Sequence, residues 1–218
     1  MKLFDLLVEY GGTLLAGLGI TLKLAILGII FASIIGVLCA LINVSKNKIL
    51  KWITSIYIHI IRGTPFLVQA YIIYFGLPMA LGIRMSEMTA GIIAISLNAG
   101  AYMAEIMRGG IEAVDKGQME AARSLGLSSR KAMQKVILPQ AIRTMAPSLI
   151  NQFIITLKDT SILSIIGIRE LTMAGKLVIA KNYESMAMWT LVAFYYFIVI
   201  FTITKISRYI ERKTAYGK

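Results

Sequence analysis

Long apolar runs separated by short polar segments dominate the chain. The runs reach or approach the roughly 20 residues that a helix needs to cross a hydrocarbon core about 30 Å thick. They are continuous, whereas a barrel strand would alternate apolar and polar residues over about ten positions. The pattern predicts an all-α membrane protein, folded as a single domain over residues 1–218. Its five predicted transmembrane helices lie near 17–42, 54–81, 89–107, 148–167 and 186–205.

Composition and the placement of charge extend this picture. Hydrophobic residues make up 57% of the chain and charged residues only 16%, which is more apolar than a soluble domain of 218 residues. Basic residues next to a span favour the cytoplasmic side of a membrane. One set of predicted loops carries fifteen of them and the opposite set carries five. We therefore expect the N-terminus outside and the C-terminus in the cytoplasm.

The net charge of +12 raises the question of a nucleic-acid partner. Most of the excess lies on the predicted cytoplasmic loops, where the preference of basic residues for that side explains it without a further ligand. We therefore expect no nucleic-acid partner.

Catalytic chemistry has few candidates in this sequence. The only histidine is His59, near the start of the second predicted span, and the only cysteine is Cys39, inside the first. A packed imidazole and a small packing thiol are the simpler interpretations. No nucleophile has a recognisable base, and no group of residues has the spacing of a metal or phosphate site. We therefore expect no enzymatic activity and no cofactor in this chain.

The longest polar interval, residues 108–147, predicts a shaped element rather than a plain loop. Residues 112–122 include good helix formers, and Gly126 can supply a turn after them. Ala121 and Ala122 keep one flank of this helix low, so that the surface of another protein can approach closely. The alternative is an ordinary solvated cytoplasmic loop.

A second short helix is predicted after the turn. Ser128 or Ser129 can cap it, it runs through Lys135, and Pro139 ends or bends it. The two helices meet at a glycine elbow. Basic side chains around the elbow could meet acidic groups on a partner: Arg123, Arg130 and Lys131.

The spacing of this element resembles the signature loop of permease subunits of ABC importers. The matching positions are Glu120-Ala121-Ala122, Gly126 and Val136-Ile137-Leu138-Pro139. Val136 departs from the usual isoleucine but keeps the branched side chain. Four further segments resemble the polar-amino-acid branch of that family, the histidine, glutamine and arginine permeases: residues 62–69, 101–105, 108–111 and 157–161.

The resemblance implies a type I ABC importer permease in a bacterial inner membrane, surrounded by lipid, which takes up a polar amino acid. It also implies three protein partners: a dimer of cytoplasmic ATPases that bind ATP with magnesium, a second permease that is identical or homologous, and an extracytoplasmic amino-acid-binding protein. The short helix of the loop would sit in a groove of the ATPase. Residues implied in this coupling are Glu120, Ala121, Ala122, Arg123, Gly126, Leu138 and Pro139.

Polar residues within the spans are candidates for the substrate pathway, because charge at membrane depth is costly unless it faces protein, water or substrate. Two stripes at i, i+4 and i+7 could face one another across the third and fourth spans. The first stripe is Asn98, Tyr102 and Glu105, and the second is Gln152, Thr156 and Asp159.

A free amino acid needs an anionic acceptor for its ammonium group and donors for its carboxylate. We assign Asp159 to the ammonium group, surrounded by Asn98, Tyr102, Gln152 and Thr160. Arg62, Gln69 and Lys158 are assigned to the carboxylate or to structural pairing. The alternative is that these polar side chains join helices through hydrogen bonds, and that Glu105 pairs with the nearby Arg108.

Prolines predict irregular helices. Pro65 and Pro78 bend or break the second span, whereas Pro147 fits the first turn of the fourth. The segment 168–185 is expected to form a short outer helix.

Two other classes of function use some of the same features. A secondary amino acid transporter or a channel not driven by ATP would have charged spans but would not need the coupling loop. A membrane-anchored structural protein would have neither a substrate nor a partner ATPase to stimulate.

Overall fold

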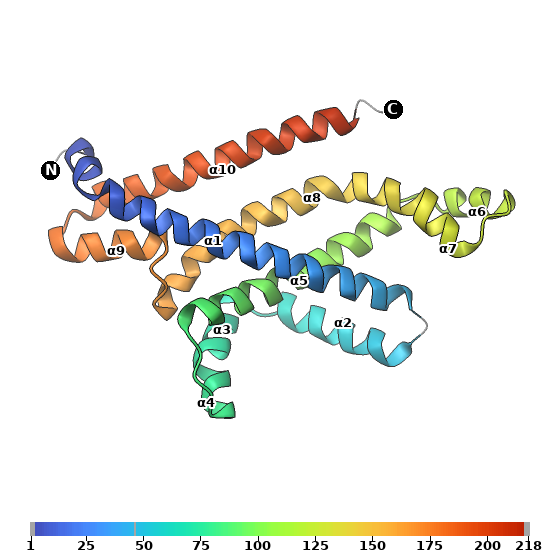
Figure 1. Ribbon diagram of the computed structural model, residues 1–218, viewed down its shortest axis with the longest axis horizontal. Coiled ribbons are helices and arrows are strands. Elements are labelled where there is room, and N and C mark those ends of the chain that lie inside the picture. The colour runs from blue at the N-terminus through green and yellow to red at the C-terminus, as the bar shows by residue number, and fades with distance from the viewer. Residues whose placement is uncertain (1–2, 46, 216–218) are drawn as a thin grey trace.

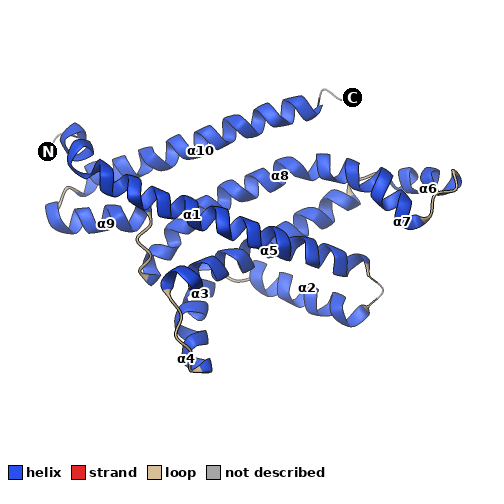
Figure 2. Ribbon diagram, in the orientation of Figure 1, coloured by secondary structure: helices blue, strands red, loops and turns tan. Residues whose placement is uncertain are grey.

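The computed structural model describes residues 3–45 and 47–215, and all the regular structure in this part is helical (Figure 2). Three short segments have other helical geometry: the π-helical η1 (Ile72–Gly76) and η2 (Met133–Ile137), and the 3₁₀-helical η3 (Thr160–Ile166). The α-helices are α1 (Leu3–Val44), α2 (Lys48–Arg62), α3 (Phe66–Tyr71), α4 (Leu77–Leu81), α5 (Glu87–Glu112), α6 (Lys116–Ser124), α7 (Ser129–Ala132), α8 (Leu138–Asp159), α9 (Leu171–Asn182) and α10 (Ser185–Ala215).

Among the described residues, four continuous helical stretches are long and apolar enough to cross a membrane, and the bent pair α2 and α3–α4 makes a fifth if it counts as one span. The predicted spans 17–42, 89–107 and 186–205 lie within α1, α5 and α10. The all-helical membrane fold predicted from the apolar runs is therefore confirmed.

The central pairing of the bundle is between α1 and α5, and small residues make it close. A Cβ placed on Gly28 of α1 would lie 2.3 Å from Ile95 Cγ2, and one on Gly100 of α5 would lie 2.8 Å from Ile35 Cγ2. Glycine at these two positions therefore leaves room for an isoleucine side chain of the other helix to pack directly against the backbone.

The second span is broken, as Pro65 predicted. Lys48–Arg62 and Phe66–Leu81 meet at an angle of 108°. Pro65 has no backbone donor, and with ψ of 138° it is extended and becomes the N-cap of α3. At Pro78 the helix continues instead, because the π-helical η1 comes directly before it and Leu77 donates to the Ile72 carbonyl five residues back.

The fourth span is longer than predicted. Helical structure is continuous over Ser129–Ile166, so Pro139 does not end the helix and Pro147 lies inside α8 rather than in a first turn. The reason resembles that at Pro78: the π-helical η2 precedes Pro139, and Leu138 donates to the Met133 carbonyl. A wider turn relieves the clash between a proline ring and the carbonyl four residues before it.

Figure 1 shows α1, α5, α8 and α10 running along the long axis, with α3–α4 projecting sideways. The end of α1 and the start of α2 lie at the same end as α6 and α7, whereas the start of α1 and α9 lie at the opposite end. The basic loops that predicted the orientation thus gather at one end of the molecule. Which end faces the cytoplasm stays a prediction.

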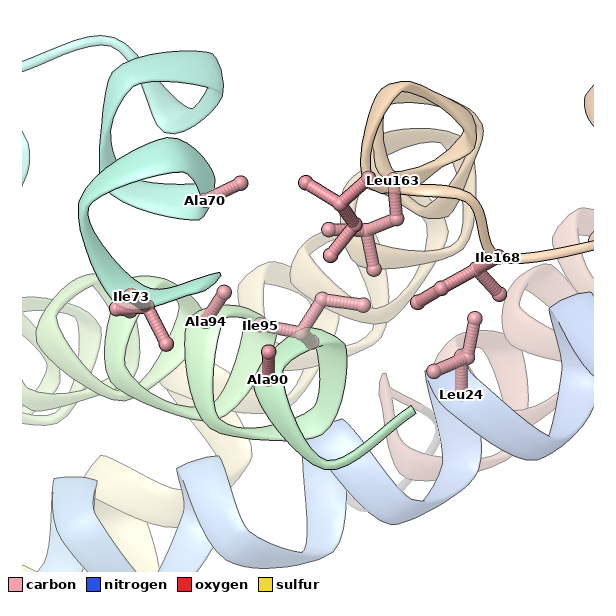
Figure 3. Close-up of a cluster of buried hydrophobic side chains, with 9 residues drawn as sticks. Leu24, Ala70, Ile73, Ala90, Ala94, Ile95, Leu163 and Ile168 are labelled. Atoms are coloured by element: carbon pink, nitrogen blue, oxygen red, sulfur yellow. The ribbon is translucent and has the colours of Figure 1, made fainter. Parts of the chain in front are cut away.

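A buried apolar cluster lies where α1, α3, α5 and η3 meet. Ala70 of α3 and Leu163 of η3 point toward one another above Ala94 of α5, and Ile168 approaches Leu24 of α1 (Figure 3). The helical stretch that begins at Ser129 therefore ends in the core.

Candidate functional site

The first candidate site is the elbow, which we define as residues 115–131. Asp115 caps α6 by accepting a hydrogen bond from the Gly117 N–H at 2.7 Å. At the other end Gly126 has φ of +84°, the Gly126 N–H bonds the Arg123 carbonyl, and the Leu127 N–H bonds the Ala122 carbonyl. This pair of bonds is a Schellman motif, in which a left-handed glycine ends the helix. The turn predicted at Gly126 is present, and the glycine in it has a left-handed conformation.

The helix after the turn is capped as predicted, by Ser128, whose Oγ accepts from the Lys131 N–H at 3.4 Å. Arg123 Nη1 donates to Ser129 Oγ at 2.7 Å and so ties the two arms of the elbow together. Gln140 Nε2 donates to Gln118 Oε1 at 3.3 Å, which joins α6 to α8. Short-range contacts therefore hold the elbow in one shape.

The predicted coupling residues divide between the surface and the interior. Ala122 is 3% exposed and faces the chain itself, and Leu138 is half-buried. The exposed members are Glu120, Ala121, Arg123, Gly126 and Pro139. Sequence reasoning missed Leu125, which is 84% exposed at the tip of the elbow. A large apolar side chain held out in this way is typical of an anchor for a partner's pocket.

The second candidate site is a charged pocket of about 540 Å³ beside α2 and α5. Its polar lining residues are Asn43, Ser55, His59, Arg62, Glu105, Arg108 and Glu112. Only Arg62 among them was assigned to the substrate from the sequence. Glu105 was placed in a polar stripe, and Glu112, which follows in the same helix, was missed.

Alternating charges line this pocket. Arg62 Nη1 lies 3.6 Å from Glu105 Oε1, and Arg62 lies 5.6 Å from the centre of the Tyr102 ring. Arg108 donates from Nε to Glu105 Oε2 at 3.1 Å and also pairs with Glu112. The pair of Glu105 and Arg108, weighed from the sequence as a structural alternative, is therefore present. Two guanidinium groups and two carboxylates can bind a ligand that carries both signs of charge.

Gln69 and Asn98, both assigned to the substrate, lie together but bond to the broken span. Asn98 Nδ2 donates to Gln69 Oε1 at 2.9 Å, and both side chains are buried. Gln69 Nε2 is within hydrogen-bond distance of the Ile61 carbonyl (2.7 Å), the Thr64 carbonyl (3.1 Å) and Thr64 Oγ1 (2.9 Å). The pair fastens the break at residues 63–65.

The other predicted ligands lie along α8 and η3. Gln152 Nε2 donates to Thr156 Oγ1 at 3.4 Å, and Thr160 Oγ1 donates to the Leu157 carbonyl at 2.7 Å. Lys158 is exposed and Asp159 half-buried. Among the residues that the structure describes, no hydrogen bond or ion pair joins this stripe to that of α5. Tyr102, Asn98 and Glu105 instead contact α2 and α3.

A third feature lies at the opposite end from the elbow and was missed in the sequence. Glu170 is fully buried and caps α9, accepting from the Thr172 and Met173 N–H groups at 2.9 and 2.8 Å. It also accepts from the Tyr196 hydroxyl at 2.9 Å and so joins α9 to α10. Burial raises the pKa of the Glu170 carboxyl, and these hydrogen bonds act in the opposite direction. The signal was an acidic residue directly before a helix.

Within residues 3–45 and 47–215, no three histidine, cysteine, aspartate or glutamate side chains are grouped so as to hold a metal ion.

Comparison with known proteins gives a consistent result. Residues 32–216 match the family described as binding-protein-dependent transport system inner membrane component. The chain is 40% identical over 201 residues to the glutamine transport system permease protein GlnP of Escherichia coli (strain K12), covering 92% of each. It is 36% identical over 200 residues to the arginine transport system permease protein ArtQ of Bacillus subtilis (strain 168), covering 92% of this chain and 91% of that one.

A solved structure is also similar over nearly the whole chain. It is a crystal structure of an amino acid ABC transporter with histidines, with a TM-score of 0.93 and 40% sequence identity. The match covers 98% of this chain and 99% of that chain.

Proposed function

The chain belongs to the family of binding-protein-dependent transport system inner membrane components, and from this premise we propose how it works. It is a multi-pass inner-membrane protein, the permease subunit of an ABC importer for an amino acid. The elbow is the place where movement of a cytoplasmic ATPase enters the chain, and the charged pocket is a place where the amino acid is held during passage.

One observation carries the coupling proposal: the helical stretch Ser129–Ile166 is continuous from the elbow to the core. Its 38 residues extend about 57 Å at ~1.5 Å per residue. Leu163 and Ile166, at its far end, pack against α1, α3 and α5. A displacement of the elbow therefore moves a rigid rod whose other end belongs to the core, which is how a small shift at one site is carried to another.

The shape of the elbow supports a docking role. It protrudes at one end of the molecule in Figure 1, and its turn is held by bonds within residues 115–131. Leu125 supplies an apolar anchor, and Glu120 and Arg123 supply charged groups beside it. Because Arg123 ties its two arms together and Gln118 ties it to α8, the elbow can move as a unit with that helix.

The chemistry of the charged pocket supports the cargo proposal. A free amino acid carries an ammonium and a carboxylate, and the pocket offers Glu105 and Glu112 for the first and Arg62 and Arg108 for the second. These four groups neutralise one another within the pocket. When a zwitterion binds, its ammonium can pair with a carboxylate and its carboxylate with a guanidinium group, so that no charge is left unpaired. Asp159 stays a second candidate for the ammonium group.

The importer needs partners outside this chain. We propose two cytoplasmic ATPases that bind ATP with magnesium, a second permease subunit, identical or homologous, and an extracytoplasmic amino-acid-binding protein. The chain supplies the translocation path and no ATPase site. Its cargo is a polar amino acid, in keeping with the glutamine and arginine permeases that it resembles.

Gly126→Asp tests the coupling role, with Gly126→Asn as its matched control. A Cβ at Gly126 meets nothing within 4 Å in this chain, so the two variants differ mainly in the charge that they present to a docked ATPase. We expect Gly126→Asp to lower ATP-driven uptake in proteoliposomes at least tenfold, or to prevent co-purification of the ATPase, and Gly126→Asn to retain most of it. Normal uptake together with normal co-purification in Gly126→Asp would overturn the proposal. Uptake without ATP would favour a secondary transporter.

A further inference from the structure

An apolar groove of about 680 Å³ lies between the end of α1, the end of α5 and the helical stretch that starts at Ser129. Val37 and Leu41 line it from α1, Met107 and Ile111 from α5, and Met133 and Ile142 from the third side. Protein interiors rarely leave empty spaces larger than a water molecule. An apolar groove of this size at the side of a membrane helix bundle favours an apolar occupant over water.

The groove opens outward along a face that suits hydrocarbon. Leu41 is 60% exposed and Ile142 is 57% exposed at its rims. The apolar lining from Met133 to Leu149 extends about 24 Å at ~1.5 Å per residue, close to one half of a bilayer that is about 40–45 Å thick with its headgroup regions. The groove thus matches the depth of one leaflet.

One end of the groove is polar and positively charged. Ser129, Arg130 and Gln134 line it there, and Arg130 forms no ion pair with any carboxylate that the structure describes. Residues 129–158 contain five basic residues and no acidic one. An occupant that brings a negative charge to this end is therefore favoured over a neutral one.

The level of this end agrees with a lipid headgroup. The apolar run of α1 closes at Asn43, and this end of α1 lies at the same end of the molecule as α7 (Figure 1). Trp52, which is 67% exposed, follows near the start of α2, where an indole commonly anchors at the membrane surface. Arg130 therefore lies near the level at which the apolar run of α1 ends and the helical stretch from Ser129 begins. Phosphate groups of lipids lie at such a boundary between apolar and polar regions.

We infer that the groove binds one anionic phospholipid of the leaflet on the elbow side, with an acyl chain along α1, α5 and α8 and the phosphate at Arg130. The inference goes beyond the proposed function and rests only on the chain crossing a membrane. Because the groove separates the α1–α5 pair from the helix that carries the elbow, its occupant fills the joint between them.

The test uses the full-length chain purified in detergent, without ATPase, and native mass spectrometry with added phosphatidylglycerol or phosphatidylcholine. We expect one phosphatidylglycerol retained per chain in preference to phosphatidylcholine. Arg130→Gln should weaken phosphatidylglycerol binding about fivefold, as expected for one basic group near a lipid surface. Its matched control is Lys131→Gln, the neighbouring exposed cation outside the groove lining.

A second pair of variants tests the acyl-chain part. Ile142→Trp fills the groove and should lower retention of both lipids at least tenfold, whereas Ile155→Trp, a 40% exposed position of α8 outside the groove, should not. Unchanged retention in both Arg130→Gln and Ile142→Trp overturns the inference. If Ile142→Trp instead changes the oligomeric state and leaves lipid retention intact, the groove is an interface between copies and the inference is wrong.

Discussion

Two of the interruptions of helical structure in the described part of the chain are held in opposite ways. The break at residues 63–65 turns the second span by 108° and is fastened by buried Gln69 and Asn98 from α3 and α5. The turn at Gly126 is exposed and is held by bonds among its own neighbours. The first belongs to the core, whereas the second keeps its shape independently of it.

This difference makes the break at residues 63–65 a fixed corner of the bundle and the turn at Gly126 a movable one. A substitution at the break leaves buried side-chain amide groups without hydrogen-bond partners, so it lowers the stability of the whole bundle. Altering the elbow changes only one turn and the surface that it presents. A permease needs both kinds, because its path must keep its shape while one element follows a moving partner.

Gln69→Leu should show the largest effect on stability. It leaves buried Asn98 Nδ2 and the Ile61 carbonyl without their partner, and each unsatisfied buried group costs roughly 1–3 kcal/mol. We expect the free energy of unfolding to fall by about 3 kcal/mol, measured by denaturant titration in detergent. Asn98→Leu and the double variant complete the cycle, whose total should be smaller than the sum of the single changes. Strict additivity would mean that the two amides do not act as one fastening.

Gly126→Ala should show an intermediate and local effect. The space around a Cβ is open, so only φ of +84° penalises the side chain, by about 1–2 kcal/mol. We expect faster amide exchange within residues 116–135 and unchanged exchange at the break, measured by hydrogen–deuterium exchange with mass spectrometry. Asparagine tolerates a left-handed conformation better than alanine does, so amide exchange in Gly126→Asn should be intermediate between that of the unaltered chain and that of Gly126→Ala. Exchange that rises across the whole bundle would contradict the separation of the elbow from the core.

Ser128→Ala should show the smallest effect. It removes the side-chain cap of the second arm, a contact of 3.4 Å, and such caps are typically worth about 1 kcal/mol or less at this length. The measurement is exchange of the amides of α7, with Ser161→Ala as a comparison because that hydroxyl bonds the Lys158 carbonyl elsewhere in the chain. A loss of stability as large as that of Gln69→Leu would place the elbow in the core after all.

The elbow was predictable because its determinants are neighbours in sequence. A glycine that can take a left-handed conformation and a serine three residues before the amide that it caps are signals within one short window. The apolar runs that predicted the spans are equally local. The π-helical turns were not predictable in this way, because nothing in the local pattern showed that the helix would widen before Pro78 and Pro139 instead of ending.

The helical membrane class, the apolar spans, the break at Pro65 and the elbow at Gly126 all follow from hydropathy or backbone chemistry over a few neighbouring residues. The roles of the intramembrane polar groups instead depend on contacts between helices that are distant in sequence. The tertiary structure joins Gln69 to Asn98 across 29 positions and Arg62 to Glu105 across 43. Helical periodicity places a residue on a face but does not say which helix that face meets, and the partner decides whether a polar group fastens the bundle or lines its path.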